Sequence, residues 1–287
     1  MTEIIKTIPE MRALAAAWKK EGLSLGFVPT MGFLHAGHRS LIDRARSEND
    51  RVVVSIFVNP LQFGPEEDLA GYPRDLERDL EVCRAAGAEA IFLPAAADMN
   101  PPEARARVTM PELTNTLCGA SRPGHFHGVL TVVTKLFNIV QPDRAYFGRK
   151  DAQQLAVINA MVRDLNMPVQ VVPCPLVREP DGLALSSRNV YLNPTERRAA
   201  LVLSRSLAVG RSRLAAGETR AETLKAEMRA KIEKEPLVRL DYLEIVDAGT
   251  MQPVADIDRP VLAALAAFVG RARLIDNFLW PQSDALV

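Results

Sequence analysis

Short apolar segments alternate with amphipathic segments through the first 177 residues, and this alternation limits the folds open to the chain. Leu25–Val28 and Val52–Val58 are rich in Val and Phe, as buried parallel strands are. Between them, residues 38–50 carry apolar side chains at helical spacing. A strand, a helix and a second strand in this order form the repeating unit of a parallel α/β sheet.

The same alternation continues to Val177. Further helices and strands are expected, in chain order, at 74–87, 90–94, 129–140, 145–148, 150–166 and 169–177. We therefore predict an α/β fold whose first domain, residues 1–177, is a Rossmann-like, doubly wound parallel sheet.

Residues 178–287 have a different pattern. Asn193, Pro194 and Glu196 form a strong helix start, because Asn caps, Pro suits the first helical position and Glu completes a capping box. The expected elements are two helices and then two strands, at about 194–216, 218–235, 240–247 and 261–270. This order predicts a second, smaller α+β domain at the C-terminal end.

Composition argues against several classes of function. The 35 Lys and Arg residues balance 35 Asp and Glu residues, whereas a nucleic-acid-binding protein would carry a basic excess. The three cysteines are far apart and form no Cys-x-x-Cys pair, as in reduced proteins. The first twenty residues lack a signal-peptide pattern, and no apolar run is long enough to span a bilayer. We expect a cytoplasmic protein that binds neither nucleic acid nor membrane.

The stretch FVPTMGFLHAGH, residues 27–38, lies where an apolar strand meets a helix start. Helix N-termini present N–H groups and a partial positive charge, and Gly32 and Gly37 allow a ligand close to the backbone. Imidazoles at His35 and His38 can stabilise charge that grows on a phosphate. They can also simply cap and pack a turn, whereas the spacing does not match a His-Glu-x-x-His zinc motif. The local chemistry favours phosphate binding.

Four further polar clusters end predicted strands or lie near the predicted domain boundary. They are residues 57–63, 121–128, 147–151 and 184–189. Lys150 near a helix start suits a phosphate, and Ser186–Arg188 form a compact donor set for a pyrophosphate. Gln62 and Gln154 suit a small hydroxylated acid. Each cluster alone also fits an ordinary loop or turn, but their common placement predicts one cleft that collects them.

Taken together, five stretches resemble the pantothenate synthetase family. They are VPTMGFLHAGH, VSIFVNPLQFGPEEDLAGYPRDLERD, SRPGHFHGV, KLFNIVQPDRAYFGRKDAQQ and LALSSRNVYL, in that family's order. The resemblance implies an AMP-forming ligase that joins (R)-pantoate to β-alanine through a pantoyl adenylate, with ATP as a substrate and Mg2+ as a cofactor. It further implies pantothenate and coenzyme A biosynthesis, a nucleotide- and pantoate-binding domain at 1–177, a lid domain at 178–287, and a cytoplasmic homodimer.

The resemblance also assigns roles to individual residues. The residues implied in catalysis are His35, His38, Lys150, Ser186, Ser187 and Arg188. The residues implied in ATP binding are Pro29, Thr30, Met31, Gly32, Phe33, Leu34, His35, Ala36, Gly37, His38, Gly148, Arg149, Lys150, Asp151, Val177, Leu185, Ser186, Ser187 and Arg188. Those implied in binding pantoate or β-alanine are Met31, Gln62, Tyr72, Arg122 and Gln154, and Asp79 is the implied metal ligand.

Within this resemblance His38 is the catalytic histidine, and His35 assists on the phosphates. Lys150 and Ser186–Arg188 neutralise the leaving pyrophosphate. Such a nucleotidyl transfer depends on positioning and on charge stabilisation. A lid that excludes water would protect the adenylate, and the 184–190 loop is a candidate hinge.

Three other readings stay open. One is a nucleotidyltransferase that acts on another small acceptor and stops after the first transfer. A second is a diverged tRNA-charging enzyme, against which the zero net charge counts. A third is an inactive binding module, against which the intact His35, His38, Lys150 and Arg188 count.

Overall fold

The computed structural model describes residues 2–65 and 67–281, which form two compact units. The first unit comprises the described residues within Met1–Met110, Arg122–Gly148 and Val157–Cys174. The second comprises those within Pro111–Ser121, Arg149–Ala156 and Pro175–Val287. The chain therefore enters the second unit three times, and a simple division between residues 177 and 178 stays a prediction.

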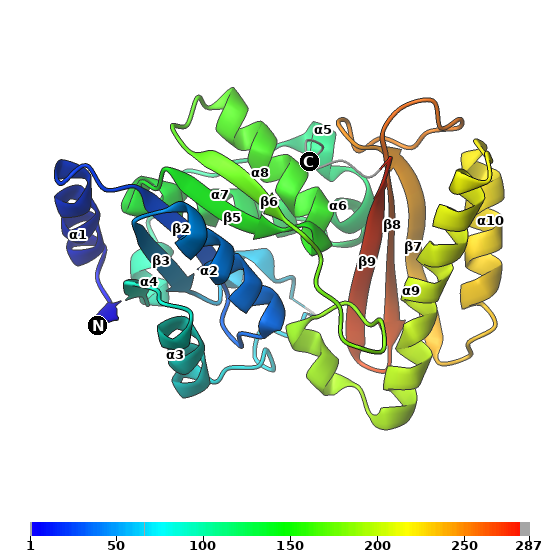
Figure 1. The fold of residues 1–287 in the computed structure, drawn as a ribbon, viewed down its shortest axis with the longest axis horizontal. Helices are drawn as coiled ribbons and strands as arrows, with labels where there is room; N and C mark the ends of the chain where they lie inside the picture. Colours follow the sequence, from blue (N-terminus) through cyan, green and yellow to red (C-terminus); the bar gives the residue numbers. More distant parts are fainter. Residues whose placement is uncertain (1, 66, 282–287) are drawn as a thin grey trace. The chain divides into compact units, whose positions relative to one another are not determined.

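A six-stranded parallel sheet organises the first unit (Figure 1). Its strands, in spatial order, are β1 (Glu3–Ile5), β4 (Ala90–Phe92), β3 (Arg51–Ile56), β2 (Leu25–Thr30), β5 (Arg144–Gly148) and β6 (Gln170–Cys174). Every neighbouring pair is parallel, so all six carboxyl ends lie at one edge. From β2 the chain builds outward through β3 to β4, and β5 and β6 continue on the other side.

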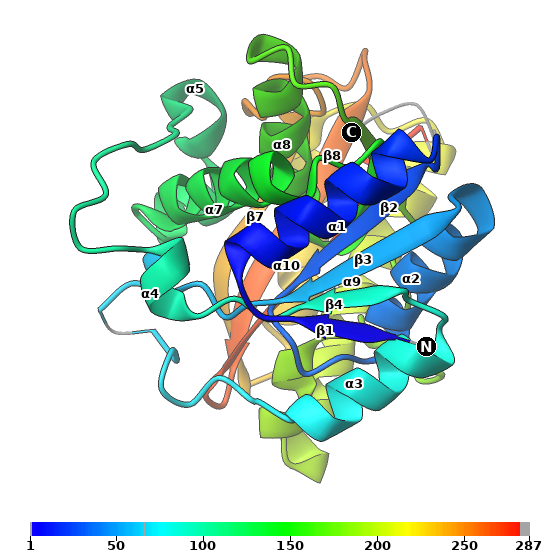
Figure 2. The same ribbon diagram turned by 90° about the vertical axis from the view of Figure 1, so that its left-hand side faces the viewer.

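Helices cover both faces of this sheet, α2 and α3 on one and α1, α7 and α8 on the other (Figure 2). The helices and short turns are α1 (Ile8–Lys20), α2 (Ala36–Glu48), η1 (Pro60–Gln62), α3 (Leu76–Ala85), α4 (Ala96–Met99), α7 (His125–Val140) and the part of α8 (Ala152–Asp164) from Val157 onward. Adjacent residues of β2 point to opposite faces: Phe27 meets Phe137 of α7, with ring centroids 6.4 Å apart, and Val28 packs with Ile42 of α2. The predicted Rossmann-like doubly wound sheet is confirmed.

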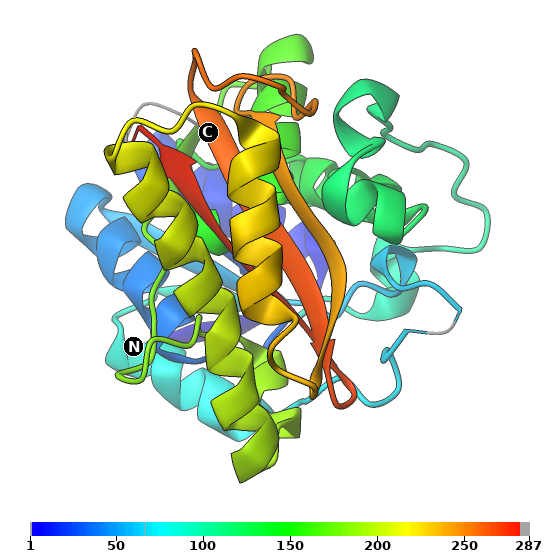
Figure 3. The same cartoon turned by 90° about the vertical axis from the view of Figure 1, so that its right-hand side faces the viewer.

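The second unit is built on an antiparallel sheet of three strands (Figure 3). Its strands and helices are β7 (Val238–Asp247), β8 (Val261–Val269), β9 (Ala272–Trp280), α5 (Pro111–Thr114), α6 (Leu117–Ser121), η2 (Arg149–Asp151), η3 (Ser187–Tyr191), α9 (Pro194–Ala215) and α10 (Ala221–Ile232). Helices α9 and α10 lie side by side over one face of the sheet, and Leu117 and Ala152 pack on the other with Leu262. Burial on both faces explains why β8 is almost continuously apolar.

Among residues 2–65 and 67–281, no helix combines the length and the apolar character needed to cross a membrane. The three-stranded sheet with its two covering helices confirms the predicted smaller α+β part of the chain. The capping box predicted at Asn193 is confirmed as well. Asn193 Oδ1 accepts the N–H groups of Thr195 and Glu196, each at 2.9 Å, and Glu196 Oε2 accepts the N–H of Asn193 at 2.9 Å.

Strand β1, helix α1 and strand β9 were not expected from the sequence, although Thr7, Pro9 and Glu10 form a capping-box start for α1 like that at Asn193. Strand β9 follows β8 after a tight turn at Gly270 and Arg271, so only the more apolar half of this hairpin stands out in the sequence. Arg273, Asp276 and Asn277 interrupt the apolar alternation of β9. Each of these three side chains has a polar partner within the second unit, which explains how a strand with polar positions is stable there.

Replacing Asn193 with alanine should lower the free energy of unfolding by about 1 kcal/mol, because two N–H groups at the start of α9 lose their acceptor. Urea denaturation followed by circular dichroism measures this change. Asn193→Asp is the matched control, since its carboxylate still accepts both bonds. Equal midpoints for the alanine variant and the parent would show that the cap contributes nothing.

Candidate active site

Strands β2 and β5 are the neighbours at which the order of the sheet changes direction. Ligands of open parallel sheets bind at the carboxyl ends of the strands beside such a point. Pro29–His38, the first predicted ATP-binding segment, ends β2 and begins α2, and Gly148 ends β5. The fold therefore places both at the edge of the first unit where a ligand is expected.

The two histidines of this segment form the start of α2. His35 is the N-cap: its Nδ1 accepts the N–H of Gly37 at 3.1 Å. His38 Nδ1 accepts the N–H of His35 at 3.3 Å, and the two ring centroids are 4.1 Å apart. An accepting Nδ1 carries no proton, so the neutral form of each ring has its proton on Nε2 and donates there. The sequence offered two uses for these histidines, capping a turn and stabilising charge on a phosphate. Capping engages only Nδ1 of each ring, so Nε2–H can still serve the second use.

The main chain just before these histidines is bent through two positive φ angles, +83° at Gly32 and +52° at Phe33. A non-glycine residue in this region costs about 1–2 kcal/mol. The Asp79 carboxylate holds the bend, since it accepts the N–H of Phe33 at 2.8 Å and that of Leu34 at 2.6 Å. A Cβ on Gly32 would lie 2.9 Å from Asp79 Oδ2, so glycine is needed for space as well as for φ.

Asp79 is only 2% exposed, and burial raises its pKa above the ordinary value although the two N–H groups act in the opposite direction. Both oxygens are already engaged with the main chain. Within residues 2–65 and 67–281, no group of three or more His, Cys, Asp or Glu side chains could hold a metal ion. These contacts fit a main-chain clamp rather than a metal site, and metal binding by Asp79 stays a prediction.

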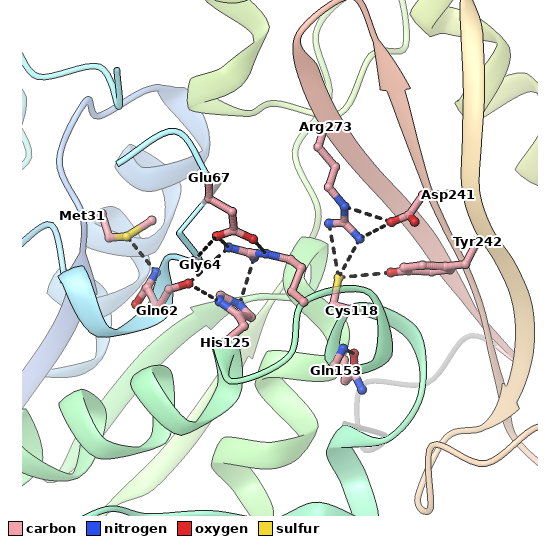
Figure 4. A network of polar contacts seen from close by, with 12 residues as sticks. Met31, Gln62, Gly64, Glu67, Cys118, His125, Gln153, Asp241, Tyr242 and Arg273 are labelled. Carbon is pink, nitrogen blue, oxygen red and sulfur yellow. Dashed lines mark hydrogen bonds and ion pairs between the residues drawn. The ribbon is translucent and has the colours of Figure 1, made fainter. Parts of the chain in front are cut away.

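Gln62 lies at the end of η1, directly after β3, and is 8% exposed. Its Nε2 donates to the sulfur of Met31 at 2.8 Å (Figure 4). Its Oε1 accepts from Asn59 Nδ2 at 3.3 Å. The structure thus brings together two of the predicted pantoate residues, Met31 and Gln62, from the ends of neighbouring strands. A thioether is a weak acceptor, so the contact of the Gln62 NH2 group with Met31 is a weak one, whereas the amide oxygen is bonded to Asn59.

Arg122 makes two parallel bonds to Glu67, at 2.6 and 2.7 Å, and also donates to the Gln62 carbonyl at 3.3 Å. Burial raises the pKa of Glu67, but the hydrogen bond and charge of Arg122 outweigh it, so the pKa lies below its ordinary value. Tyr72 is buried and meets Phe63 edge to face at 5.7 Å. Two further predicted residues, Arg122 and Tyr72, therefore contact the segment that carries Gln62 rather than standing apart from it.

The segment SRPGHFHG is not the loop that its composition suggests, because α7 begins at His125. Gly124 has a φ of +84° and stands immediately before the helix. His125 and Gly128, one turn apart, both contact η1: the imidazole Nδ1 lies 2.9 Å from the Gln62 carbonyl, and a Cβ at Gly128 would lie 2.6 Å from the Gln62 nitrogen.

In the second unit, η2 carries the predicted Lys150. Asn277 of β9 donates from Nδ2 to the carbonyl oxygens of both Arg149, at 3.0 Å, and Lys150, at 2.8 Å. The Lys150 ammonium lies 3.3 Å from an oxygen of Asp151. Asn277 thus holds the main chain on either side of the lysine, a role for which the sequence offers no signal.

A hairpin leads to the predicted Ser186–Arg188 run. The N–H of Leu185 donates to the Val177 carbonyl at 3.0 Å, which joins two residues predicted to bind the nucleotide. Ser186 Oγ accepts the N–H of Arg188 at 3.2 Å and caps η3. At the base of the hairpin, Arg178 pairs with Asp276 through bonds of 2.7 and 2.8 Å.

Two contacts tie the segment 111–121 to the rest of the second unit. Gln153 donates to the carbonyls of Leu113 and Thr116, at 3.0 and 2.9 Å, so its neighbour Gln154 is the glutamine of this pair that remains for a ligand role. The Cys118 sulfur lies 3.2 Å from the hydroxyl of Tyr242 (Figure 4), whose pKa burial raises well above the ordinary value.

The predicted residues divide between the two units. The first unit holds Pro29–His38, Gln62, Tyr72, Asp79, Arg122 and Gly148. The second holds Arg149, Lys150, Asp151, Gln154, Val177, Leu185, Ser186, Ser187 and Arg188. Glu67 and Asn277, which act on predicted residues, were not singled out in the sequence. Asn59 and His125 lie in the clusters 57–63 and 121–128 but were given no role of their own, and both contact Gln62.

The fold and these residues define a parallel α/β protein with a helix start suited to phosphate at its central strand. The family model for pantoate-beta-alanine ligase matches residues 3–279, and the chain belongs to this family. A pantothenate synthetase of Ruminiclostridium cellulolyticum is 58% identical over 274 residues, which are 96% of this chain and 97% of that protein. One of Thermotoga petrophila is 56% identical over 275 residues, 96% of this chain and 98% of that protein.

Solved structures agree with this assignment. The crystal structure of pantothenate synthetase from Thermus thermophilus is similar with a TM-score of 0.90, at 47% identity, over 96% of this chain and 99% of that chain. The pantoate-beta-alanine ligase of Francisella tularensis, solved with beta-gamma ATP and beta-alanine, has a TM-score of 0.79 at 34% identity, over 99% and 100% of the chains. The family predicted from the sequence is confirmed.

Asp79→Asn should lower the free energy of unfolding by about 2 kcal/mol and ligase turnover at least about ten-fold, because an amide accepts only one of the two N–H bonds and sets its NH2 group against the other. Thermal unfolding and initial rates measure the two effects. Glu77→Gln, on an exposed position of the same helix, makes the same change of charge and is the control. Equal behaviour of the two variants would contradict the clamp.

Asn277→Ala should lower ligase turnover about ten-fold and the free energy of unfolding by about 1–3 kcal/mol, because the carbonyls of Arg149 and Lys150 lose the donor that holds them. Asn277→Asp should be equally slow, since a carboxylate cannot donate to either carbonyl. A fast aspartate variant would show that the donor function is not what matters at this position.

Proposed function

We propose that this chain condenses (R)-pantoate with β-alanine to give pantothenate, with ATP converted to AMP and pyrophosphate, as a step of coenzyme A biosynthesis. The observation that carries the proposal is the family match over residues 3–279, together with the His35–His38 helix start beside the Met31–Gln62 contact. The His35–His38 helix start suits the phosphates of ATP, and the Met31–Gln62 pair suits pantoate, a small hydroxy acid.

In the first step a carboxylate oxygen of pantoate attacks the α-phosphorus of ATP. The bond from that phosphorus to the bridging oxygen breaks, and pyrophosphate leaves with the electron pair. Negative charge grows on the phosphate oxygens, where the Nε2–H donors of His35 and His38 and the N-terminus of α2 stabilise it. Lys150 and Ser186–Arg188 neutralise the departing pyrophosphate.

Pantoate binding falls to Gln62, Gln154 and Met31. The Gln62 amide is held against the Met31 sulfur, a weak acceptor, so a hydroxyl or carboxylate of pantoate can replace that contact at little cost. Tyr72 and Arg122 support the segment that carries Gln62. ATP is bound by the remaining residues of Pro29–His38, by Gly148–Asp151, and by Val177 and Leu185.

In the second step the amine of β-alanine attacks the acyl carbon of the pantoyl adenylate. The bond from that carbon to the phosphate oxygen breaks, AMP leaves, and the amine loses a proton as the amide forms. Gln62 lies near the incoming amine in this scheme. The intermediate is prone to hydrolysis, so exclusion of water by the C-terminal residues, with a hinge at 184–190, is part of the proposal.

Magnesium, a homodimer and a cytoplasmic location belong to the proposal through the family resemblance. Magnesium keeps part of its water shell and is commonly held through substrate phosphates with few carboxylates. The described side chains offer no cluster that would hold it alone, so the ATP phosphates are its main ligands in this scheme.

Pantoate-dependent exchange of labelled pyrophosphate into ATP, with magnesium and without β-alanine, tests the two-step reaction. We expect exchange with pantoate, none without it, and release of AMP and pantothenate once β-alanine is added. His38→Ala should reduce exchange at least about a hundred-fold, because a donor to the charge developing in the transition state is lost. A parent protein that binds ATP but shows no exchange would refute the proposal.

A further inference from the structure

The proposed mechanism uses His35 and His38 but leaves the second histidine pair of the chain, His125 and His127, without a role. The two lie on opposite sides of the first turn of α7. His127 is exposed, whereas His125 is half-buried against the turn that carries Gln62. His127 can therefore serve as a control for substitutions at His125.

We propose that His125 is a positioning residue that fixes the main chain of Gln62 and thereby sets the affinity for pantoate. Its Nδ1 lies 2.9 Å from the Gln62 carbonyl oxygen, and because a carbonyl only accepts, Nδ1 carries the proton. Its Nε2 lies 3.1 Å from an Nη1 of Arg122, which always donates, so Nε2 is the acceptor. Both ring nitrogens are thus committed to this arrangement (Figure 4).

Arg122, which contacts the His125 imidazole, is fixed by bonds of its own. Arg122 forms its two parallel bonds with Glu67 and donates a third to the same Gln62 carbonyl. Two donors from separate residues therefore converge on one main-chain oxygen. The oxygen belongs to the residue whose side-chain amide is proposed to bind pantoate.

The turn needs such support because its own bonds are few. Within η1 the N–H of Gln62 reaches the Asn59 carbonyl at 3.4 Å, and that of Phe63 reaches the Pro60 carbonyl at 3.2 Å. On the side of α7, Gly128 lies so close that a Cβ would collide with the carbonyl oxygen of Leu61. Asn59 adds side-chain bonds to the turn and to α7: its Oδ1 accepts the N–H of Leu61 at 3.3 Å, and its Nδ2 donates to the Gly128 carbonyl at 3.1 Å. His125 and Arg122 are the side chains that bond the main-chain carbonyl of Gln62 itself.

The inference rests on the proposed function, since it takes Gln62 as a pantoate ligand. It predicts a selective effect. His125→Ala should raise the KM for pantoate about ten-fold while the KM for ATP changes less than about two-fold, because the lost bond positions Gln62 and not the His35–His38 helix start. His127→Ala, two residues away and exposed, is the matched control and should behave as the parent.

Two amides of different length separate positioning from mere packing. Asparagine at 125 places an amide nitrogen near Nδ1 and can donate to the Gln62 carbonyl, whereas glutamine places it near Nε2, beside the Arg122 donor. His125→Asn should keep a pantoate KM within about three-fold of the parent, and His125→Gln should resemble the alanine variant. This pair retains a polar side chain of similar size, so it decides the question even where His125→Ala does not fold.

Steady-state kinetics with each substrate varied in turn, alongside thermal unfolding, distinguish the outcomes. Equal pantoate KM values for His125→Asn and His125→Gln, or parallel changes in the KM for both pantoate and ATP, would overturn the positioning role. The parent protein decides the proposed function separately. A parent without pantoate-dependent pyrophosphate exchange refutes the function, whereas an active parent with unaffected His125 variants refutes only this inference.

Discussion

The common direction of six strands is the constraint on which the first unit depends. Because every neighbouring pair is parallel, the strand ends at Thr30, Ile56 and Gly148 lie at one edge, and the segments that follow them begin together. The chain order changes direction between β2 and β5 at this edge. Segments far apart in sequence, the His35–His38 helix start and the Gln62 turn, therefore become neighbours without any contact between their own side chains being required.

The residues around this edge act largely on the main chain. Asp79 binds two N–H groups of the bend before His35, and His125 and Arg122 bind the carbonyl of Gln62. In the second unit Asn277 donates to the main-chain carbonyls of Arg149 and Lys150. A side chain that contacts substrate is only as well placed as its own backbone, so these partners matter for catalysis although none needs to touch a reacting atom.

The fold could be predicted from the sequence because its helices and strands follow local patterns of residues. Helical spacing and the Asn193 cap depend on residues three or four positions apart, and buried strands on runs of consecutive apolar residues, and all are found in the structure. Strand β9 escaped because Asp276 and Asn277 interrupt its alternation, and their partners lie elsewhere in the second unit. The first turn of α7, residues 125–128, was not expected because Gly124 and its neighbours have the composition of a loop, and this turn packs on η1.

The site, too, was predictable from the sequence only where it depends on local patterns. The sequence alone determined that a glycine-rich His-Ala-Gly-His segment follows a buried strand, that Lys150 lies at a strand-to-helix turn, and that the whole set resembles one ligase family. Only the tertiary structure decided which polar atom meets which backbone group, since Asp79 binds Phe33 across 46 positions, His125 binds Gln62 across 63 and Asn277 binds Lys150 across 127. The physical reason is that a hydrogen bond depends on distance in space, and spacing along the chain constrains that distance only within a helix turn or a tight bend.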